Sequence, residues 1–365
     1  MLISSPRYKI IDNIMQALLG VLFHFIGGFA SGSFYIPYKR VKGWNWESYW
    51  IVGGLFSWLI IPFIAAWLTV PGFMDIIGAT PGNVLFWTYF LGVLWGIGGL
   101  TFGLSMRYLG MSLGMAVALG FCSAFGALIP PIYREFFSDD PNNFTAMLHS
   151  NKGMFVLLGT LVCLAGIAIC GKAGMMKEKE LSHEQKTATI QEFNLRKGLA
   201  VAIVSGILSA CMSFAISAGK TMGDAAVANN ANPLFKNNVI FVVIMLGGLT
   251  TNLIWCVFLN KRNQSFGDYT NKSTPLARNY FFAALAGTTW FLQFFFYGMG
   301  ESNLGNDASS WILHMAFIIL ISGVWGFVLK EWKNASRKTL STISLGIFTI
   351  ILSVVLVGYG NSLSN

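Results

Sequence analysis

The sequence predicts an all-α integral membrane protein with ten transmembrane helices, arranged as two inverted five-helix repeats with both termini in the periplasm. Three observations lead to this fold class. Hydrophobic residues make up 55% of the chain and charged residues 11%, whereas a typical soluble domain is about 25% charged. Ten apolar stretches are long enough to cross a bilayer. The Lys and Arg residues between these stretches gather on one side.

The ten spans are justified by length, since a membrane-crossing helix needs about 20 mainly apolar residues. They occupy residues 14–36, 48–70, 84–107, 110–132, 153–172, 198–219, 237–259, 279–300, 308–329 and 340–360. The short sequence Arg107–Gly110 separates the third span from the fourth, because the combined apolar run is too long for one helix. The first span exceeds a signal-peptide core and has no small-residue cleavage pattern, so we expect it to be retained.

Basic residues predict the orientation. Of the 24 Lys and Arg residues, 18 lie in loops that follow odd-numbered spans. These loops are therefore expected in the cytoplasm, with both termini outside. The longest basic loop, residues 173–197, divides the chain into a first half, residues 1–172, and a second half, residues 198–365. Each half crosses an odd number of times, so the halves have opposite orientations, as in the inverted repeats of secondary transporters.

Weak internal similarity accompanies this division. The sequence Ser33–Ile36 in the first span parallels Ser213–Ile216 in the sixth. The stretch 94–114 aligns without gaps with the stretch 285–305, and this alignment pairs Gly96 with Gly287.

Several function classes lack their signatures. The sequence has no Gly-rich phosphate loop, no HExxH and no GxSxG, so we expect neither an enzyme nor a cofactor. The loops are too short for a nucleotide-binding domain, which disfavours an ATP-driven pump. The five Cys residues form no CxxC pair and predict no metal site. The net charge of +9 follows from the loop cations and does not indicate a nucleic acid partner.

Polar and aromatic groups at mid-depth are the candidates for substrate binding, because polar groups inside spans are costly and usually face a cavity or a partner helix. Indole faces suit the C–H side of a sugar ring, and amide or imidazole groups suit its hydroxyls. The candidates are His24, Trp95, Asn252, Trp290, Gln293, Trp311 and His314. The alternatives are packing for each Trp and a bond to a neighbouring helix for each His.

A second set of residues is predicted to serve proton coupling or gating: Asp307, Glu47, Lys39, Arg107 and Glu301. His24 and His314 are also candidates for coupling, because His titrates near neutrality. The alternative for Glu47 is a surface ion pair with Lys39 or Arg40. The alternative for Asp307 is a charge favoured at a helix N-terminus.

Longer motifs carry a resemblance that covers essentially the whole chain. They are Phe34-Tyr35-x-Pro37-x-Lys39-x-Val41-Lys42-x-Trp44-x-Trp46-Glu47, Trp95–Gly98, Gly103-Leu104-x-Met106–Ser112, Glu192–Leu195 with Lys197-Gly198, Leu292–Tyr297, Trp311-x-Leu313–Met315 and Lys330–Trp332 with Asn334-Ala335. With these motifs the chain resembles the bacterial L-rhamnose–proton symporter family of the drug/metabolite transporter superfamily. Two segments depart from the family pattern. One is the turn 300–310, in which Asp307 is nevertheless kept, and the other is the N-terminal tail, residues 1–12.

The resemblance implies ten helices, an inner-membrane location, and import of L-rhamnose, or of L-lyxose or L-mannose, together with a proton by alternating access. Sugar, proton and membrane lipid would be its partners. It also suggests that Lys39, Glu47 and Arg107 form a cytoplasmic gate. Two other functions stay open: a carrier for another sugar or metabolite coupled to sodium or exchange, and a non-transporting membrane protein, either a sugar sensor or an integral-membrane enzyme.

Overall fold

The computed structural model describes residues 6–109, 111–137, 141, 143–180, 194–328 and 335–363. Within these ranges it describes all side chains except those of residues 6–13, 106, 107, 109, 111–116, 137, 178, 195, 326, 327, 361 and 362. Every regular element in the described part is helical. The long helices are α1 (Pro6–Ser33), α6 (Gly82–Leu109), α7 (Met111–Phe137), α9 (Asn151–Glu180), α11 (Leu195–Ala218), α13 (Asn238–Asn263), α14 (Leu276–Leu304), α15 (Asp307–Val328) and α16 (Arg337–Ser362).

The short elements are α2 (Tyr35–Tyr38), α3 (Trp46–Leu55), the π-helix η1 (Phe56–Ile60), α4 (Ile61–Thr69), α5 (Phe73–Ala79), α8 (Phe144–His149), α12 (Lys220–Ala228), and the 3₁₀ helices η2 (Pro233–Phe235) and η3 (Ser265–Tyr269). Elements α3, η1 and α4 follow one another without a break and form the second span together. A π-helical turn inside a helix often marks a functional site.

Ten helical segments within the described residues are long and apolar enough to cross a membrane, which confirms the predicted number. They are Ile14–Tyr38, Trp46–Thr69, Gly82–Ser105, Val117–Phe136, Asn151–Lys177, Arg196–Ala228, Pro233–Asn263, Leu276–Leu304, Asp307–Trp325 and Arg337–Gly360. Two segments continue well beyond their predicted ends: α9 reaches Glu180 instead of ending near residue 172, and the sixth segment reaches Ala228 through α12 instead of ending near residue 219.

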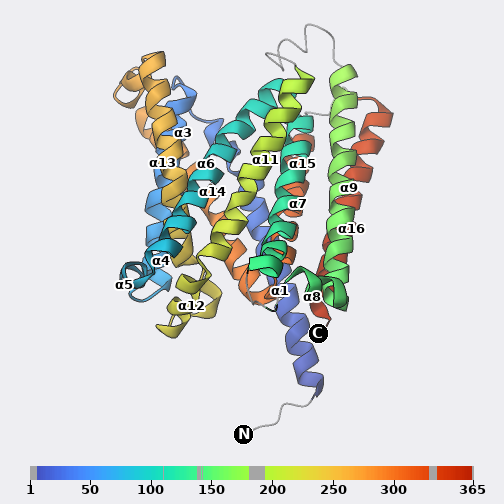
Figure 1. The fold of residues 1–365 in the computed structure, drawn as a ribbon. Coiled ribbons are helices and arrows are strands. Elements are labelled where there is room, and N and C mark those ends of the chain that lie inside the picture. The colour runs from blue at the N-terminus through green and yellow to red at the C-terminus, as the bar shows by residue number, and fades with distance from the viewer. Residues whose placement is uncertain are drawn as a thin grey trace.

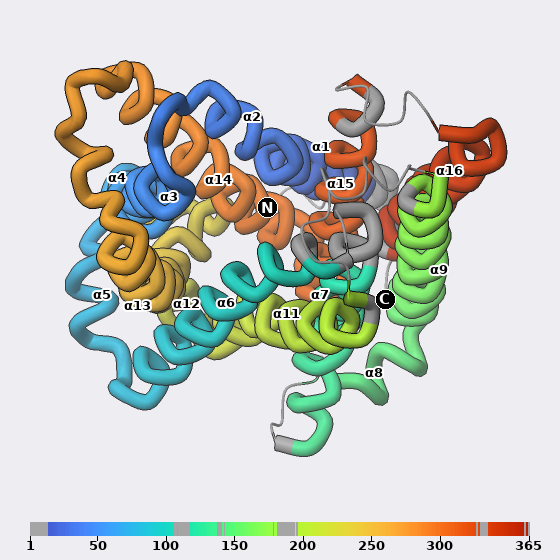
Figure 2. The backbone as a smooth tube through the Cα atoms, turned by 90° about the horizontal axis from the view of Figure 1, so that it is seen from above, coloured from blue at the N-terminus to red at the C-terminus, as the bar shows by residue number. Residues whose placement is uncertain are grey.

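The two ends of the bundle carry different short elements (Figure 1). Helices α5, α8 and α12 lie at the end where α1 begins and α16 ends; we call this the α8 end. The opposite end carries η3 and the start of α3, and we call it the η3 end. Figure 2 looks down the bundle and shows α9 and α16 as a pair beside the other helices. Helix α1 packs on α14 and α15, and α11 packs on α6 and α7.

A tight turn joins α14 to α15 at the α8 end. Gly305 has a φ of +60°, which suits a glycine at a helix C-terminus, and its N–H bonds the Glu301 carbonyl at 2.8 Å. The Asn306 side chain then accepts the Ser309 N–H at 2.8 Å and caps α15. This turn brings the last turn of α14, with Glu301, beside the first turn of α15, with Asp307.

Candidate substrate and proton site

One face of α14 carries two of the predicted site residues, Trp290 and Glu301, and connects the aromatic and polar parts of the site. Trp290, Phe294, Tyr297 and Glu301 follow one another at spacings of four, three and four residues, so their side chains share this face. The face extends over about 16 Å at 1.5 Å per residue. Its η3-end part is aromatic and its α8-end part is polar and charged.

The aromatic wall consists of Trp58, Trp95, Trp290 and Phe294. The Trp95 ring centroid lies 5.4 Å from that of Trp290 with the planes tilted by 33°, and 5.7 Å from that of Phe294. Trp58, from the π-helix η1, lies 5.8 Å from Trp290. Trp95 and Trp290 are only half-buried. The buried Trp58 Nε1 has no hydrogen-bond acceptor among the described residues, so this wall combines indole faces with one unused N–H donor.

Asn252 supports this wall through Trp50, which contacts Trp58. Its Oδ1 accepts the Trp50 indole N–H at 3.0 Å, and its Nδ2 donates to the Gly248 carbonyl at 2.9 Å. Trp50 in turn contacts Trp58 with ring centroids 6.1 Å apart. Because its amide is engaged on both sides, Asn252 positions Trp50 in this conformation. Gln293 is buried on α14, next to α1: a Cβ at Gly27 would lie 2.9 Å from the Gln293 carbonyl oxygen.

The histidine cluster consists of His24, Tyr297, Trp311 and His314, all buried. The ring centroids of His24 and His314 lie 6.0 Å apart. Tyr297 contacts both, at 5.4 Å from His24 and 5.3 Å from His314. Trp311 donates its indole N–H to the Cys122 carbonyl on α7 at 3.0 Å, so its N–H is used for helix packing.

Both histidines are chemically unusual for a protein interior. Neither the two ring nitrogens of His24 nor those of His314 have a hydrogen-bond partner among the described residues. A buried donor or acceptor left unmatched costs about 1–3 kcal/mol. Such groups in native proteins usually indicate a bound water, an ion or a functional role.

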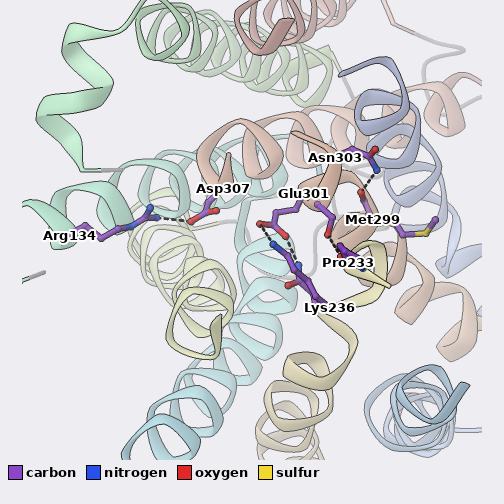
Figure 3. Close-up of polar contacts among 9 residues, drawn as sticks. Arg134, Pro233, Lys236, Met299, Glu301, Asn303 and Asp307 are labelled. Atoms are coloured by element: carbon purple, nitrogen blue, oxygen red, sulfur yellow. Dashed lines mark hydrogen bonds and ion pairs between the residues drawn. The ribbon is translucent and has the colours of Figure 1, made fainter. Parts of the chain in front are cut away.

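Two acidic residues are paired at the α8 end (Figure 3). Arg134 Nη2 of α7 lies 2.6 Å from Asp307 Oδ2 of α15. Glu301 accepts the Asn237 amide N–H at 2.6 Å, and Lys236 Nζ lies 3.8 Å from its other oxygen. The Glu301 pair is well buried and the Asp307 pair is partly exposed. These contacts connect α7 to α15 and the start of α13 to the end of α14.

Glu47 lies in a separate polar network at the η3 end. It is buried, and its Oε1 accepts hydrogen bonds from Asn263 Nδ2 at 2.9 Å and Ser265 Oγ at 2.6 Å. Among its described contacts none is with Lys39, which is exposed, so the surface ion pair considered above is not formed with that residue. The side chain of Arg107, the third member of the predicted gate, lies outside the described residues.

The sequence separates residues that the fold brings together. His24, Trp311 and His314 meet in one cluster, Trp95 and Trp290 meet in the aromatic wall, and Glu301 lies beyond them on the α14 face. The prediction overlooked Tyr297, which connects the two histidines, and Trp58. Tyr297 lies four residues after Gln293 and four before Glu301, a spacing that could have placed it on the same face. The positions of Trp58, Arg134 and Lys236 depend on contacts between distant segments.

Comparison with known proteins gives a consistent picture. The family model described as "L-rhamnose-proton symport protein (RhaT)" matches residues 12–363. A protein from Citrobacter koseri named L-rhamnose-proton symporter is 41% identical over 347 residues, which cover 94% of this chain and 97% of that relative. A protein of the same name from Salmonella paratyphi A is 40% identical over 347 residues with the same coverage.

Proposed function

Because this chain belongs to the L-rhamnose–proton symport protein family, we propose that it imports L-rhamnose together with a proton by alternating access. It is a multi-pass protein of the bacterial inner membrane and a transporter, not an enzyme. The observation that carries the proposal is the family match across residues 12–363. The aromatic wall and the histidine cluster give this match a chemical basis.

We propose that the sugar binds between the aromatic wall and the histidine cluster. Rhamnose is a 6-deoxy sugar, and its methyl group and C–H face suit the half-buried indoles of Trp95 and Trp290. The Trp58 N–H and the Gln293 amide are the candidate partners of its hydroxyls, and His24 and His314 border the site. Asn252 and Trp311 then support the site through Trp50 and Tyr297, respectively.

The two halves, residues 1–172 and 198–365, are proposed to be inverted repeats joined by residues 173–197. An exchange of packing partners supports this division. Helix α1 of the first half packs on α14 and α15 of the second, and α11 of the second half packs on α6 and α7 of the first. Helices α9 and α16, the last of each half, pack on each other. A two-fold relation between the halves produces this pattern.

Matching close contacts of glycines also support the repeat. A Cβ at Gly96 of α6 would lie 3.1 Å from Gly248 Cα on α13. A Cβ at Gly287 of α14 would lie 2.9 Å from Gly53 Cα on α3. The gapless alignment of the sequence pairs Gly96 with Gly287, so paired glycines make equivalent contacts with equivalent helices. Small residues let helices approach closely in a membrane.

We place the α8 end, with both termini, in the periplasm and the η3 end in the cytoplasm, on the basis of the Lys and Arg distribution. The Arg134–Asp307 and Lys236–Glu301 pairs then belong to a periplasmic gate that is closed in this conformation. Lys39, Glu47 and Arg107 remain the proposed cytoplasmic gate. In this structure Glu47 accepts hydrogen bonds from Asn263 and Ser265, and it would exchange these partners during the transport cycle.

The proposal is tested by external pH in a weakly buffered, de-energised suspension of cells that express the chain. Addition of L-rhamnose is expected to make the medium more alkaline, whereas L-fucose and D-glucose leave the pH unchanged. L-Lyxose and L-mannose define the breadth of specificity in the same assay. Entry of labelled rhamnose without a pH change would indicate sodium coupling or exchange, and binding without entry would indicate a sensor. Either result would refute symport with protons.

A further inference from the structure

The two histidines of the cluster are the strongest unexplained feature of the molecule. His24 of α1 and His314 of α15 are both buried, lie 6.0 Å apart between ring centroids, and have four ring nitrogens without partners among the described residues. The other nitrogen donor of the cluster, Trp311 Nε1, is bonded to the Cys122 carbonyl. The polar groups of this cluster that lack a partner are therefore its two imidazoles, the side chains that proteins most often use to bind and release a proton.

We propose that His24 and His314 together form the proton-binding site of the carrier, an inference that rests on the proposed sugar–proton symport. The transported proton passes from periplasmic water to a ring nitrogen of the pair and converts one neutral imidazole into an imidazolium. It leaves to cytoplasmic water after the conformational change. No bond other than N–H forms or breaks, and the net charge of the site changes by one.

The surrounding backbone is shaped around the two rings. A Cβ at Gly300 of α14 would lie 2.7 Å from His24 Nε2, and a Cβ at Gly27 of α1 would lie 3.2 Å from His314 Cε1. Glycine at these two positions leaves the space that the rings occupy. Close backbone approach to a ring nitrogen also limits which partners can reach it, so a small species such as a proton or one water fits this geometry.

Nearby groups explain how protonation is tied to conformation. Tyr297 contacts both rings and can stabilise an imidazolium through its π system. Glu301 follows Gly300 directly, but Lys236 and Asn237 of the α13 start hold its carboxylate in this structure. Asp307 of α15 and Arg134 of α7 pair with each other, and among the other described charged groups Lys220 of α12 also acts electrostatically on Glu301.

The charge on the pair therefore depends on the periplasmic gate. While Lys236 and Asn237 hold the Glu301 carboxylate, it is not available to the histidines. When the gate opens and Lys236 withdraws, the free Glu301 carboxylate favours an imidazolium beside it. The proton is thus bound in the open state and released after closure. Trp290 and Tyr297 share one face of α14. Sugar bound at the aromatic wall therefore contacts the same helix that places Tyr297 against the two histidines.

The test compares His24→Gln and His314→Gln with the wild type and with His149→Gln. Glutamine keeps an N–H donor but does not titrate. His149 is an exposed histidine of α8 outside the cluster, with Nδ1 2.8 Å from the Thr145 carbonyl, so its variant is the matched control. In proteoliposomes, both cluster variants are expected to exchange labelled rhamnose by counterflow. They are expected to lose accumulation driven by a pH gradient about tenfold or more.

A second measurement needs no variant. Imidazole ¹⁵N shifts of the purified wild type, followed through pH with and without rhamnose, report protonation of each histidine. Rhamnose is expected to change the titration of His24 and His314 and to leave that of His149 unchanged.

Three outcomes would each overturn the inference. The cluster variants could accumulate sugar like the wild type, the variants could lose sugar binding altogether, or the cluster histidines of the wild type could fail to titrate. Wild-type protein that does not bind rhamnose would refute the proposed function, while the titration without sugar still decides the proton site.

Discussion

Arg134 of α7 donates a 2.6 Å hydrogen bond to Asp307 of α15, so the two helices are joined at the α8 end by a charge pair. The relative exposure of the side chains is 16% for Arg134 and 39% for Asp307, so solvent weakens the pair only in part. Hydrogen bonds between charged groups contribute about 1.5–3 kcal/mol when they are shielded, and exposed ion pairs much less. A contact of this strength can hold a gate closed and can still be broken in each transport cycle.

Substitution Asp307→Asn is expected to loosen this contact and lower rhamnose accumulation several-fold, because the amide cannot form the ion pair. The reversed pair, Arg134→Asp with Asp307→Arg, is expected to recover much of the loss. Initial rates of labelled rhamnose uptake in cells, normalised to protein in the membrane, measure both effects. If Asp307→Asn transports at the wild-type rate, the pair has no gating role.

Substitution Trp95→Ala is expected to raise the KM for rhamnose about fivefold or more, since it removes an indole face worth about 1–2 kcal/mol from the aromatic wall. Trp95→Phe keeps a flat ring and is expected to lose less. Trp67→Ala is the control, because Trp67 on α4 has a relative exposure of 70% and lies outside the wall. Equal KM values for Trp95→Ala and Trp67→Ala would exclude Trp95 from the sugar site.

Substitution Glu47→Gln is expected to impair active uptake while leaving the fold intact. The amide oxygen can still accept bonds from Asn263 and Ser265, but the negative charge that a cytoplasmic gate needs is lost. Asp268→Asn provides a comparison, because Asp268 accepts from Asn45 and Ser48 at the same end without belonging to the proposed gate. Undiminished active uptake by Glu47→Gln would rule out its role in gating.

The hydrogen bonds that Glu180 accepts lead us to expect that the stability of the protein depends on pH. Hydrogen bonds from the Ser336 and Thr339 hydroxyls and the Ser336 N–H lower the pKa of this exposed carboxyl below its ordinary value. The contact between α9 and α16 is thus favoured above the ordinary carboxyl pKa of about 4.3 and lost as pH falls through the lowered value. Thermal unfolding of wild type and Glu180→Gln from neutral to acid pH is expected to converge at low pH. A constant difference across this range would contradict the assignment.

Hydropathy was sufficient to predict the ten spans, because crossing a bilayer demands local apolar length. It placed the end of the fifth span too early: α9 continues to Glu180, since apolarity reports where the membrane ends and not where the helix ends. The site was predicted only in part. His24 and His314 are polar residues within apolar spans and are visible in the sequence. The role of Tyr297 between them depends on how α1, α14 and α15 pack, and the orientation of Trp58 depends on a π-helical turn.

Substitution Gly287→Ala tests the packing that supports the inverted repeat. A methyl group there would lie 2.9 Å from Gly53 Cα and would also meet the Gly53 carbonyl, which belongs to backbone and cannot rotate away. We expect the apparent Tm of the purified protein to fall by several degrees, consistent with about 1–3 kcal/mol for overpacking. Gly99→Ala is the matched control, because nothing lies within 4 Å of a Cβ at Gly99 of α6 and alanine favours helix. Gly96→Ala, at the paired position, is expected to behave like Gly287→Ala. If Gly96→Ala and Gly287→Ala were as stable as Gly99→Ala, close approach of the backbones would not hold the two halves together.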